Sequence, residues 1–170
     1  MTIKRYLLVA AFILLAYCNA LAGGVGTWKN YLAYSDVQWV EEGSNKLYVL
    51  ASNSLYTYNK NDQSIKTYDK VNGLSDTDIR FIAWNKTARR LVIIYSNNNI
   101  DLLDDRGNVT NVPDYYLKTT MADKTINGID MSGVYCYLST GFGLVKLNVA
   151  KAEISDSYNL SFPVNYSYIE

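Results

Sequence analysis

A repeat of 43 to 44 residues is the sequence feature that most narrows what this chain can fold into. Each copy holds a short apolar run, a polar hinge of Ser, Asn, Thr or Gly, and a second run in which apolar and polar residues alternate. The copies begin at Leu47, Leu91 and Val134. Alternation with a period of two is typical of a β-strand with one buried face, so each copy predicts a pair of strands joined by a tight turn.

Two further strands complete each repeat unit. The unit opens with a short strand, predicted at Val37–Glu41, Ile79–Trp84 and Ile126–Met131, and it closes with an outer arm, predicted at Ser64–Tyr68, Val109–Val112 and Glu153–Tyr158. The turns are rich in Asn, Asp and Gly, which accept the backbone conformations of tight hairpins. A four-stranded antiparallel unit that recurs every 40 to 45 residues is the blade of a β-propeller. The sequence therefore predicts an all-β chain of about three four-stranded blades.

The predicted blades do not amount to a closed ring. They span residues 34–75, 76–123 and 124–162, and residues 166–170 match the first strand of a fourth blade. A blade buries its faces only against its neighbours, and closed propellers contain about four to eight blades. We therefore interpret residues 23–170 as an incomplete β-propeller domain, and we expect the chain to be part of a longer protein.

The N-terminal 22 residues predict an export signal. Two basic residues, Lys4 and Arg5, precede the apolar run 6–17, which is too short to span a bilayer. The small residues around Leu21 predict cleavage between Ala22 and Gly23. A lipoprotein signal ending at Cys18 is the alternative, but the bulky residue before that cysteine disfavours it. No later segment is long and apolar enough to cross a membrane. Because of the signal, we expect an exported protein in the periplasm or on the outer surface of a Gram-negative bacterium.

The composition argues against catalysis and against nucleic-acid binding. The chain contains 16 tyrosines and no histidine, the residue best suited to act as a base or a metal ligand near neutral pH. Without Lys4 and Arg5, 14 basic residues face 16 acidic ones, and they form no basic patch that nucleic acid would need. Cys136 is then the one cysteine left, and its apolar neighbours indicate a buried thiol. We predict no catalytic residue, no cofactor and no metal site.

Three polar clusters are better explained by structure than by chemistry. The acidic residues within 101–105 lack the spacing of an EF-hand loop and suit a hairpin turn. Asp76 and Asp78 suit a loop between blades, since nothing indicates that the two carboxylates face one substrate bond. Thr140–Gly143 lacks the Lys-Ser/Thr pair and the helix of a phosphate-binding loop, so its glycines indicate a tight turn.

Tyr115 and Tyr116 are the best candidates for contact with a partner or a glycan. Both lie in the longer connection 114–125 between the second and third predicted blades. Exposed aromatic side chains on such loops suit sugar stacking or a protein partner. The same two side chains could instead cover the apolar edge of the neighbouring blade, and the sequence does not separate the two interpretations.

A set of motifs in a fixed order resembles a known family. The motifs are Trp28–Leu32, Asn72–Asp76 followed by Ile79, Tyr95–Leu103, Asp123–Asn127 and Leu138–Val145. Together they resemble the N-terminal propeller of the PorZ family, components of the type IX (Por) secretion system. The resemblance implies a non-catalytic cell-surface protein with two propellers and a C-terminal β-sandwich. It also implies a sortase partner and a role in attaching secreted cargo to anionic lipopolysaccharide.

Two other functions stay open at this level. One is a periplasmic ligand-sensing propeller of a hybrid two-component regulator, which shares the Gly-Leu-Ser and Thr-x-x-Gly-Leu elements of the blades. The other is a propeller lyase or glycosidase, for which the sequence offers no convergent pair of carboxylates. Sequence beyond Glu170 separates the first from the PorZ-like function, because a sensor would continue into a transmembrane helix and a kinase module.

Overall fold

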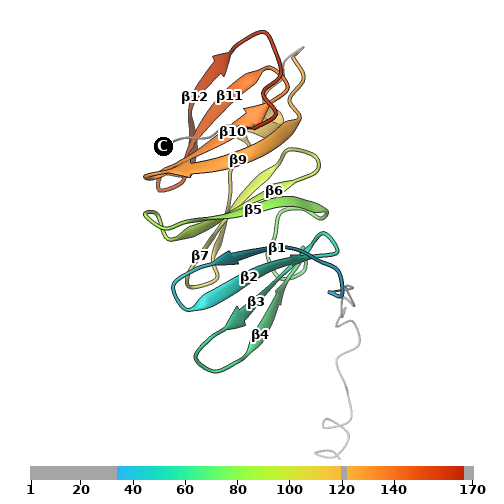
Figure 1. The fold of residues 1–170 in the computed structure, drawn as a ribbon, viewed down its shortest axis with the longest axis vertical. Coiled ribbons are helices and arrows are strands. Elements are labelled where there is room, and N and C mark those ends of the chain that lie inside the picture. Colours follow the sequence, from blue (N-terminus) through green and yellow to red (C-terminus); the bar gives the residue numbers. More distant parts are fainter. Residues whose placement is uncertain (1–33, 120–121, 167–170) are drawn as a thin grey trace, which may run out of the picture. The chain divides into compact units, whose positions relative to one another are not determined.

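Three antiparallel sheets of four strands each form the fold (Figure 1). The computed structural model describes residues 34–119 and 122–166. The first sheet contains β1 (Val37–Glu42), β2 (Lys46–Ala51), β3 (Ser54–Asn59) and β4 (Ile65–Tyr68). The second contains β5 (Ile79–Asn85), β6 (Arg90–Tyr95), β7 (Ile100–Asp104) and β8 (Val109–Asn111). The third contains β9 (Ile126–Ser132), β10 (Tyr135–Thr140), β11 (Gly143–Asn148) and β12 (Glu153–Asn159).

Every strand pairs with the next strand in the chain, so each sheet is a four-stranded meander. The prediction of an all-β chain built from propeller blades, without a closed ring, is confirmed. The predicted leader 1–22, with its cleavage point at Ala22 and Gly23, lies outside the described residues, as do residues 167–170 of the expected fourth blade. Within the described part of the chain, no helix is long and apolar enough to cross a membrane.

The same irregularity recurs where the first two strands of each sheet pair. The register skips one residue of the first strand, at Gln38, Arg80 and Asn127. A bulge of this kind bends the strand and increases its twist. Its recurrence at equivalent positions shows that the three sheets are copies of one unit.

Hydrophobic side chains between neighbouring blades form two separate cores. The first core lies between blades one and two, where Tyr48 of β2 stacks on Trp84 of β5 with ring centroids 5.2 Å apart. The second lies between blades two and three and includes Ile94 of β6 and Leu138 of β10. Each fully buried side chain of this size contributes about 1.5–3 kcal/mol. Packing between blades is therefore the main source of stability.

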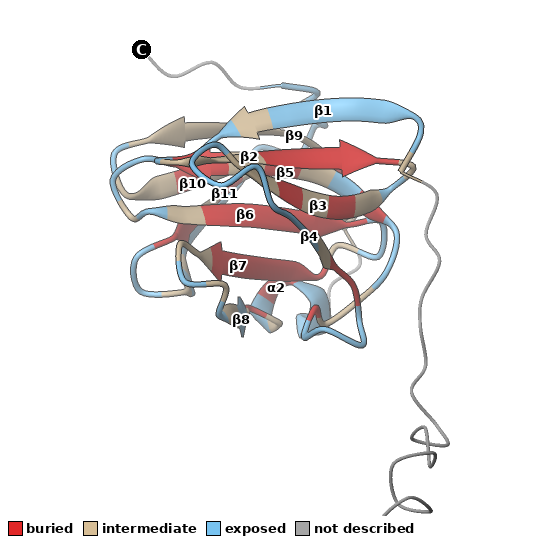
Figure 2. Ribbon diagram, turned by 90° about the horizontal axis from the view of Figure 1, so that it is seen from below, coloured by how far each residue is buried: buried red, intermediate tan, exposed pale blue. Residues whose placement is uncertain are grey.

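The middle blade is covered on both faces. Nearly every residue of β6 and β7 is buried, whereas most of β1 is exposed (Figure 2). Strands covered on both faces are continuously apolar, which explains the unbroken run Leu91–Tyr95 in β6. The order of the blades along the chain therefore sets how deeply each one is buried.

Hydrogen bonds donated by backbone amides also join the blades at their hinges. The amide of Ile79, which opens blade two, donates to the carbonyl oxygen of Asn53 in the hinge of blade one, at 3.0 Å. The amide of Ile126, which opens blade three, donates to the side-chain oxygen of Asn98 in the hinge of blade two, at 3.2 Å. Each polar hinge thus fixes the start of the following blade.

Candidate functional site

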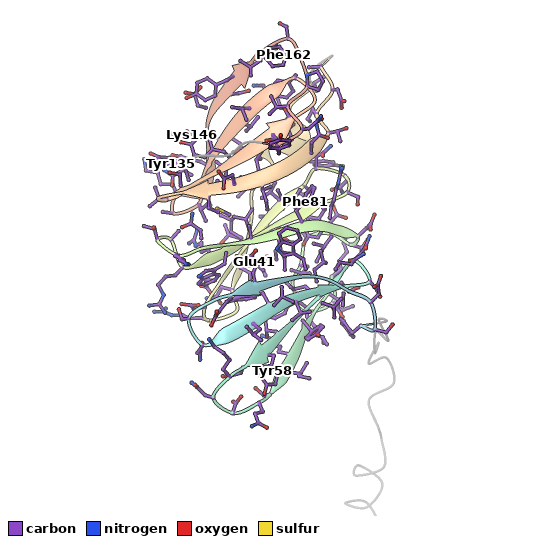
Figure 3. All side chains as sticks on the ribbon, viewed as in Figure 1. Glu41, Tyr58, Phe81, Tyr135, Lys146 and Phe162 are labelled. Carbon is purple, nitrogen blue, oxygen red and sulfur yellow. The ribbon has the colours of Figure 1, made fainter. Side chains whose placement is uncertain are left out.

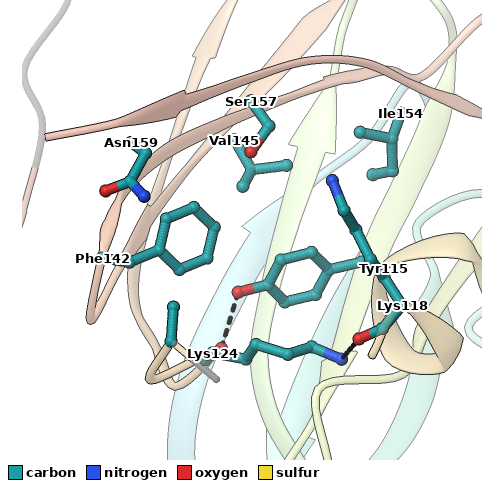
Figure 4. Close-up of a pocket in the computed structure, with 9 residues that line it drawn as sticks. Tyr115, Lys118, Lys124, Phe142, Val145, Ile154, Ser157 and Asn159 are labelled. Carbon is teal, nitrogen blue, oxygen red and sulfur yellow. Dashed lines mark hydrogen bonds between the residues drawn. The ribbon is translucent and has the colours of Figure 1, made fainter. Parts of the chain in front are cut away.

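A cavity of about 260 Å³ lies beside the third blade (Figure 4). One wall is the connection after β8, which carries the short helix α2 (Asp114–Leu117). The other wall comes from β11, β12 and the turn before β11. The lining residues are Tyr115, Lys118, Ala122, Lys124, Phe142, Val145, Ile154, Ser157 and Asn159. The cavity is therefore built by two separate segments of the chain, residues 115–124 and residues 142–159.

The connection is held in place at its start. The amide of Val112 donates to the carbonyl oxygen of Ile100 at 2.8 Å, and the side chain of Val112 is buried. Pro113 is the N-cap residue of α2, where a missing N–H costs no helical hydrogen bond. The amide of Leu117 donates to the carbonyl oxygen of Pro113 at 2.8 Å and closes the single turn.

Tyr115 is buried, which corrects the expectation that its side chain is exposed. Its exposed fraction is 4% because α2 turns the ring into the core between blades two and three. The hydroxyl donates to the carbonyl oxygen of Lys124 at 2.7 Å, and burial raises the pKa of the phenol above its ordinary value. The ring thus covers the apolar edge of the third blade and also forms one side of the cavity.

Tyr116 does not line the cavity. Its exposed fraction is 45%, and its neighbour Leu117 is 66% exposed. Consecutive helical residues point about 100° apart, so burial of Tyr115 directs Tyr116 outward. The structure therefore separates the two predicted contact residues, one beside the cavity and the other on the outer surface.

Two lysines flank the cavity, and they differ in what their ammonium groups contact. Lys124 donates to the carbonyl oxygens of Tyr116 and Lys118, both at 2.8 Å, and its Nζ lies 5.3 Å from the centre of the Tyr115 ring. The ammonium group of Lys118 extends over the cavity (Figure 4). It has no acceptor among the described residues. One ammonium group therefore holds the connection together, and the other is available to a ligand.

The rest of the cavity is apolar with a polar rim. Phe142, Val145 and Ile154 provide the apolar surface, and all three pack with the core between blades two and three. Ser157 and Asn159, both on β12, provide a hydroxyl and an amide. Such a surface is suited to binding a small molecule.

The described residues show no cluster of ligands for a metal. No group of three or more His, Cys, Asp or Glu side chains comes together within them. Cys136 is fully buried with a free thiol, as expected, and burial raises its pKa, which keeps the thiol protonated.

The acidic clusters have structural partners. Asp101 is buried and accepts three hydrogen bonds, Asp104 accepts the amides of its own turn, and Asp105 pairs with Arg89. Asp78 accepts a hydrogen bond from the side chain of Asn53 and so links blades one and two.

One family model and several solved structures are similar to this chain. The family model of the PorZ N-terminal β-propeller domain of the type IX secretion system matches residues 47–170. The solved structure of PorZ from Porphyromonas gingivalis is described as an essential surface component of that system. It is 38% identical to this chain, with a TM-score of 0.72 over 78% of this chain. The match covers 18% of the P. gingivalis chain, so this chain spans about a fifth of that relative.

Other solved structures share the fold at low identity. The extracellular domain of a putative one-component system from B. thetaiotaomicron is 16% identical, with a TM-score of 0.57, over 83% of this chain and 19% of its own. AztD from Citrobacter koseri is 15% identical, with a TM-score of 0.57, over 80% of this chain and 36% of its own. These two likenesses show the propeller fold alone. No curated protein sequence matches significantly.

Proposed function

The chain belongs to the family of PorZ N-terminal β-propeller domains, and from this membership we propose that it is the non-catalytic propeller part of a cell-surface component of the type IX secretion system. In this role it supports the maturation and surface attachment of secreted cargo. The observation that carries the proposal is the 38% identity to P. gingivalis PorZ across most of the chain. The likeness to the extracellular domain of the putative one-component system, at 16% identity, gives no comparable support to a sensing function.

The proposed partner is a sortase-like secretion component, and surface lipopolysaccharide is a second proposed ligand. A scaffold that acts through partners needs an exposed contact surface more than it needs a reactive site. Tyr116 and Leu117 form such a surface on α2, because both are large, exposed and adjacent to the rigid core. Aromatic side chains at the centre of an interface commonly contribute most of its binding energy. We assign Tyr116 to partner contact, and Tyr115 to holding α2 in position.

The proposed domain organisation follows from the same membership. Residues 1–22 act as an export signal that is cleaved between Ala22 and Gly23, and residues 23–170 form propeller blades. We assign these blades to residues 34–75, 76–123 and 124–162. Export to the periplasm or the outer surface is consistent with the description of the P. gingivalis relative as a surface component.

Direct binding to the sortase-like component of the same organism tests the scaffold function. The purified full chain is expected to bind that component, and replacing both Tyr116 and Leu117 with Asp should weaken binding at least tenfold. The matched control replaces Val71 with Asp, because this side chain is also exposed, at 67%, and lies on a different loop. Equal weakening by both variants, or no binding by the unchanged chain, would contradict the assigned contact surface.

A further inference from the structure

The cavity beside the third blade is lined by two lysine side chains. Among the residues that the structure describes, no acidic side chain lines it, and Lys118 and Lys124 are the ionic groups of its lining. The ammonium group of Lys124 is already satisfied by two carbonyl oxygens. That of Lys118 reaches over the apolar surface without an acceptor among the described residues (Figure 4). An anionic group placed there would form a charge-assisted hydrogen bond that the protein itself does not supply.

Two further donors lie on the rim. The side-chain oxygen of Asn159 accepts the amide of Ser161 at 2.9 Å, which orients the Asn159 NH₂ group as a donor. The hydroxyl of Ser157 turns toward the cavity (Figure 4). A carboxylate offers two oxygens with about four lone-pair sites, so it can accept from an ammonium group and from both neutral donors.

The size and lining of the cavity define the rest of the ligand. Its volume of about 260 Å³ lies below the range of about 300–1,000 Å³ that is typical of sites for drug-sized ligands. One ring or one branched alkyl group fits, whereas an oligosaccharide does not. The surface of Phe142, Val145 and Ile154 offers no hydrogen bonds to sugar hydroxyls and favours an apolar group.

We propose that this cavity binds a small carboxylate that carries one apolar group of about the size of a phenyl ring. Lys118 pairs with the carboxylate, and Phe142 and Ile154 flank the apolar group. The ligand is either a free acid or the C-terminal residue of a polypeptide, which present the same chemistry. Binding at this cavity is independent of the proposed secretion function, because Tyr116 and Leu117 do not line it.

Ligand-observed NMR with the full chain tests the proposal, with phenylacetate as the probe and phenylacetamide as its neutral counterpart. Phenylacetate has ten heavy atoms, so a Kd on the order of 1 mM is expected, and the amide should bind at least tenfold more weakly. Lys118→Met should weaken phenylacetate binding about tenfold and leave binding of the amide unchanged, while Lys118→Arg retains binding. Lys151→Met is the matched control, because Lys151 is exposed and lies in the turn before β12.

A second pair of probes distinguishes the two sources of the carboxylate. If N-acetyl-glycyl-phenylalanine binds at least as tightly as phenylacetate and its C-terminal amide does not, the ligand is the end of a polypeptide. If phenylacetate alone binds, the ligand is a free acid. Equal affinity for phenylacetate and phenylacetamide, unchanged phenylacetate binding by Lys118→Met, or no binding of any probe would overturn the proposal. A thermal midpoint for Lys118→Met within 1–2 °C of the unchanged chain, as expected for an exposed side chain, excludes misfolding as the cause of lost binding.

Discussion

Asp101 is a fully buried carboxylate within a strand of aliphatic side chains. It accepts the Tyr95 hydroxyl at 2.6 Å, the Ser75 amide at 2.8 Å and the Asn111 side-chain amide at 2.8 Å. These three donors come from β6, from the loop between blades one and two, and from β8. The carboxylate therefore holds the loop after blade one against the middle blade, and a buried group of this kind is costly to remove.

Replacing Asp101 with Ala is expected to lower the free energy of unfolding by about 3 kcal/mol, because three buried or half-buried donors lose their acceptor. Tyr95→Phe removes one donor and leaves the carboxylate two others, so its cost should be about 1 kcal/mol. Urea unfolding monitored by tyrosine and tryptophan fluorescence measures both. A smaller loss for Asp101→Ala than for Tyr95→Phe would contradict the function of the carboxylate as the shared acceptor.

Gly143 begins β11 with φ +147°, and a Cβ atom there would clash with the carbonyl oxygen of Tyr158. Gly143→Ala is therefore expected to lower the free energy of unfolding by about 3 kcal/mol or more, which is a large effect for a single substitution. Gly133 has φ +57° with open space around it, so Gly133→Ala should cost only about 1–2 kcal/mol. Thermal unfolding of the two variants separates steric conflict from backbone strain, and equal midpoints would contradict this explanation.

Asp78 introduces a dependence of stability on pH. Hydrogen bonds from Asn53 and Ser96 hold the pKa of its carboxyl below the ordinary value. A carboxyl whose pKa is lower in the folded state stabilises the fold above its unfolded pKa, near 4, and loses this effect as the pH falls through the folded value. Unfolding free energy should therefore decrease below about pH 4, and Asp78→Asn should show a shallower decrease over pH 2–4. An identical pH profile for the variant would exclude Asp78 as a contributor.

Some features of single residues could be predicted from the sequence, and others could not. The burial of Cys136 could be predicted, because its apolar neighbours in a strand are enough to indicate it. The cavity could not, because it forms only when the connection after β8 lies against β12. Tyr115 is buried and Tyr116 is exposed because of a single helical turn, which the local sequence does not specify.

Residues at equivalent positions of two blades can differ in burial. Leu102 of β7 and Lys146 of β11 occupy equivalent positions of their blades. Leu102 lies on the face of the second blade that packs against the third, and it is buried there. Lys146 lies on the face of the third blade that points away from the second, with its Nζ 4.0 Å from the centre of the Tyr135 ring (Figure 3). Position within the blade thus sets the direction of the side chain, and the next blade determines whether it is buried.

Leu102→Lys is expected to lower the free energy of unfolding by about 3–5 kcal/mol, because it places an unpaired charge between two blades. The converse change, Lys146→Leu, should cost about 1 kcal/mol or less, since it removes only the half-buried cation–π contacts with Tyr135 and Tyr137. Chemical denaturation of both variants provides the comparison. Similar stabilities would contradict the assignment of Leu102 to the contact between blades two and three.

The strands were predictable and the helix was not. Strand positions agree with the structure to within one or two residues at their ends, because each hairpin combines an apolar alternation with a turn signal next to it. Helix α2 has four residues, too few for a helical period to be visible, and isolated helices of that length are not stable. It forms because Val112 and Tyr115 on either side of its start are buried in the core between blades.

Burial across the whole described fold predicts which part of it opens last. The strands β6 and β7 lie between two cores, whereas β1 and β12 are largely exposed and β4 is exposed over half of its length. Amide hydrogens of β6 and β7 should therefore exchange most slowly, and those of β12 and β4 at least tenfold faster. Hydrogen exchange followed by mass spectrometry measures this order. Uniform protection over the three blades would contradict the view that packing between blades determines stability.

The secretion function is tested most directly by the fraction of type IX cargo that reaches the cell surface in processed form. The measurement compares a strain that lacks the gene with the same strain carrying the gene again. Without the gene, cargo should accumulate with its targeting segment uncleaved and should be depleted from the surface, and restoring the gene should reverse both effects. Normal processing and surface attachment of cargo in the strain without the gene would contradict the proposed function.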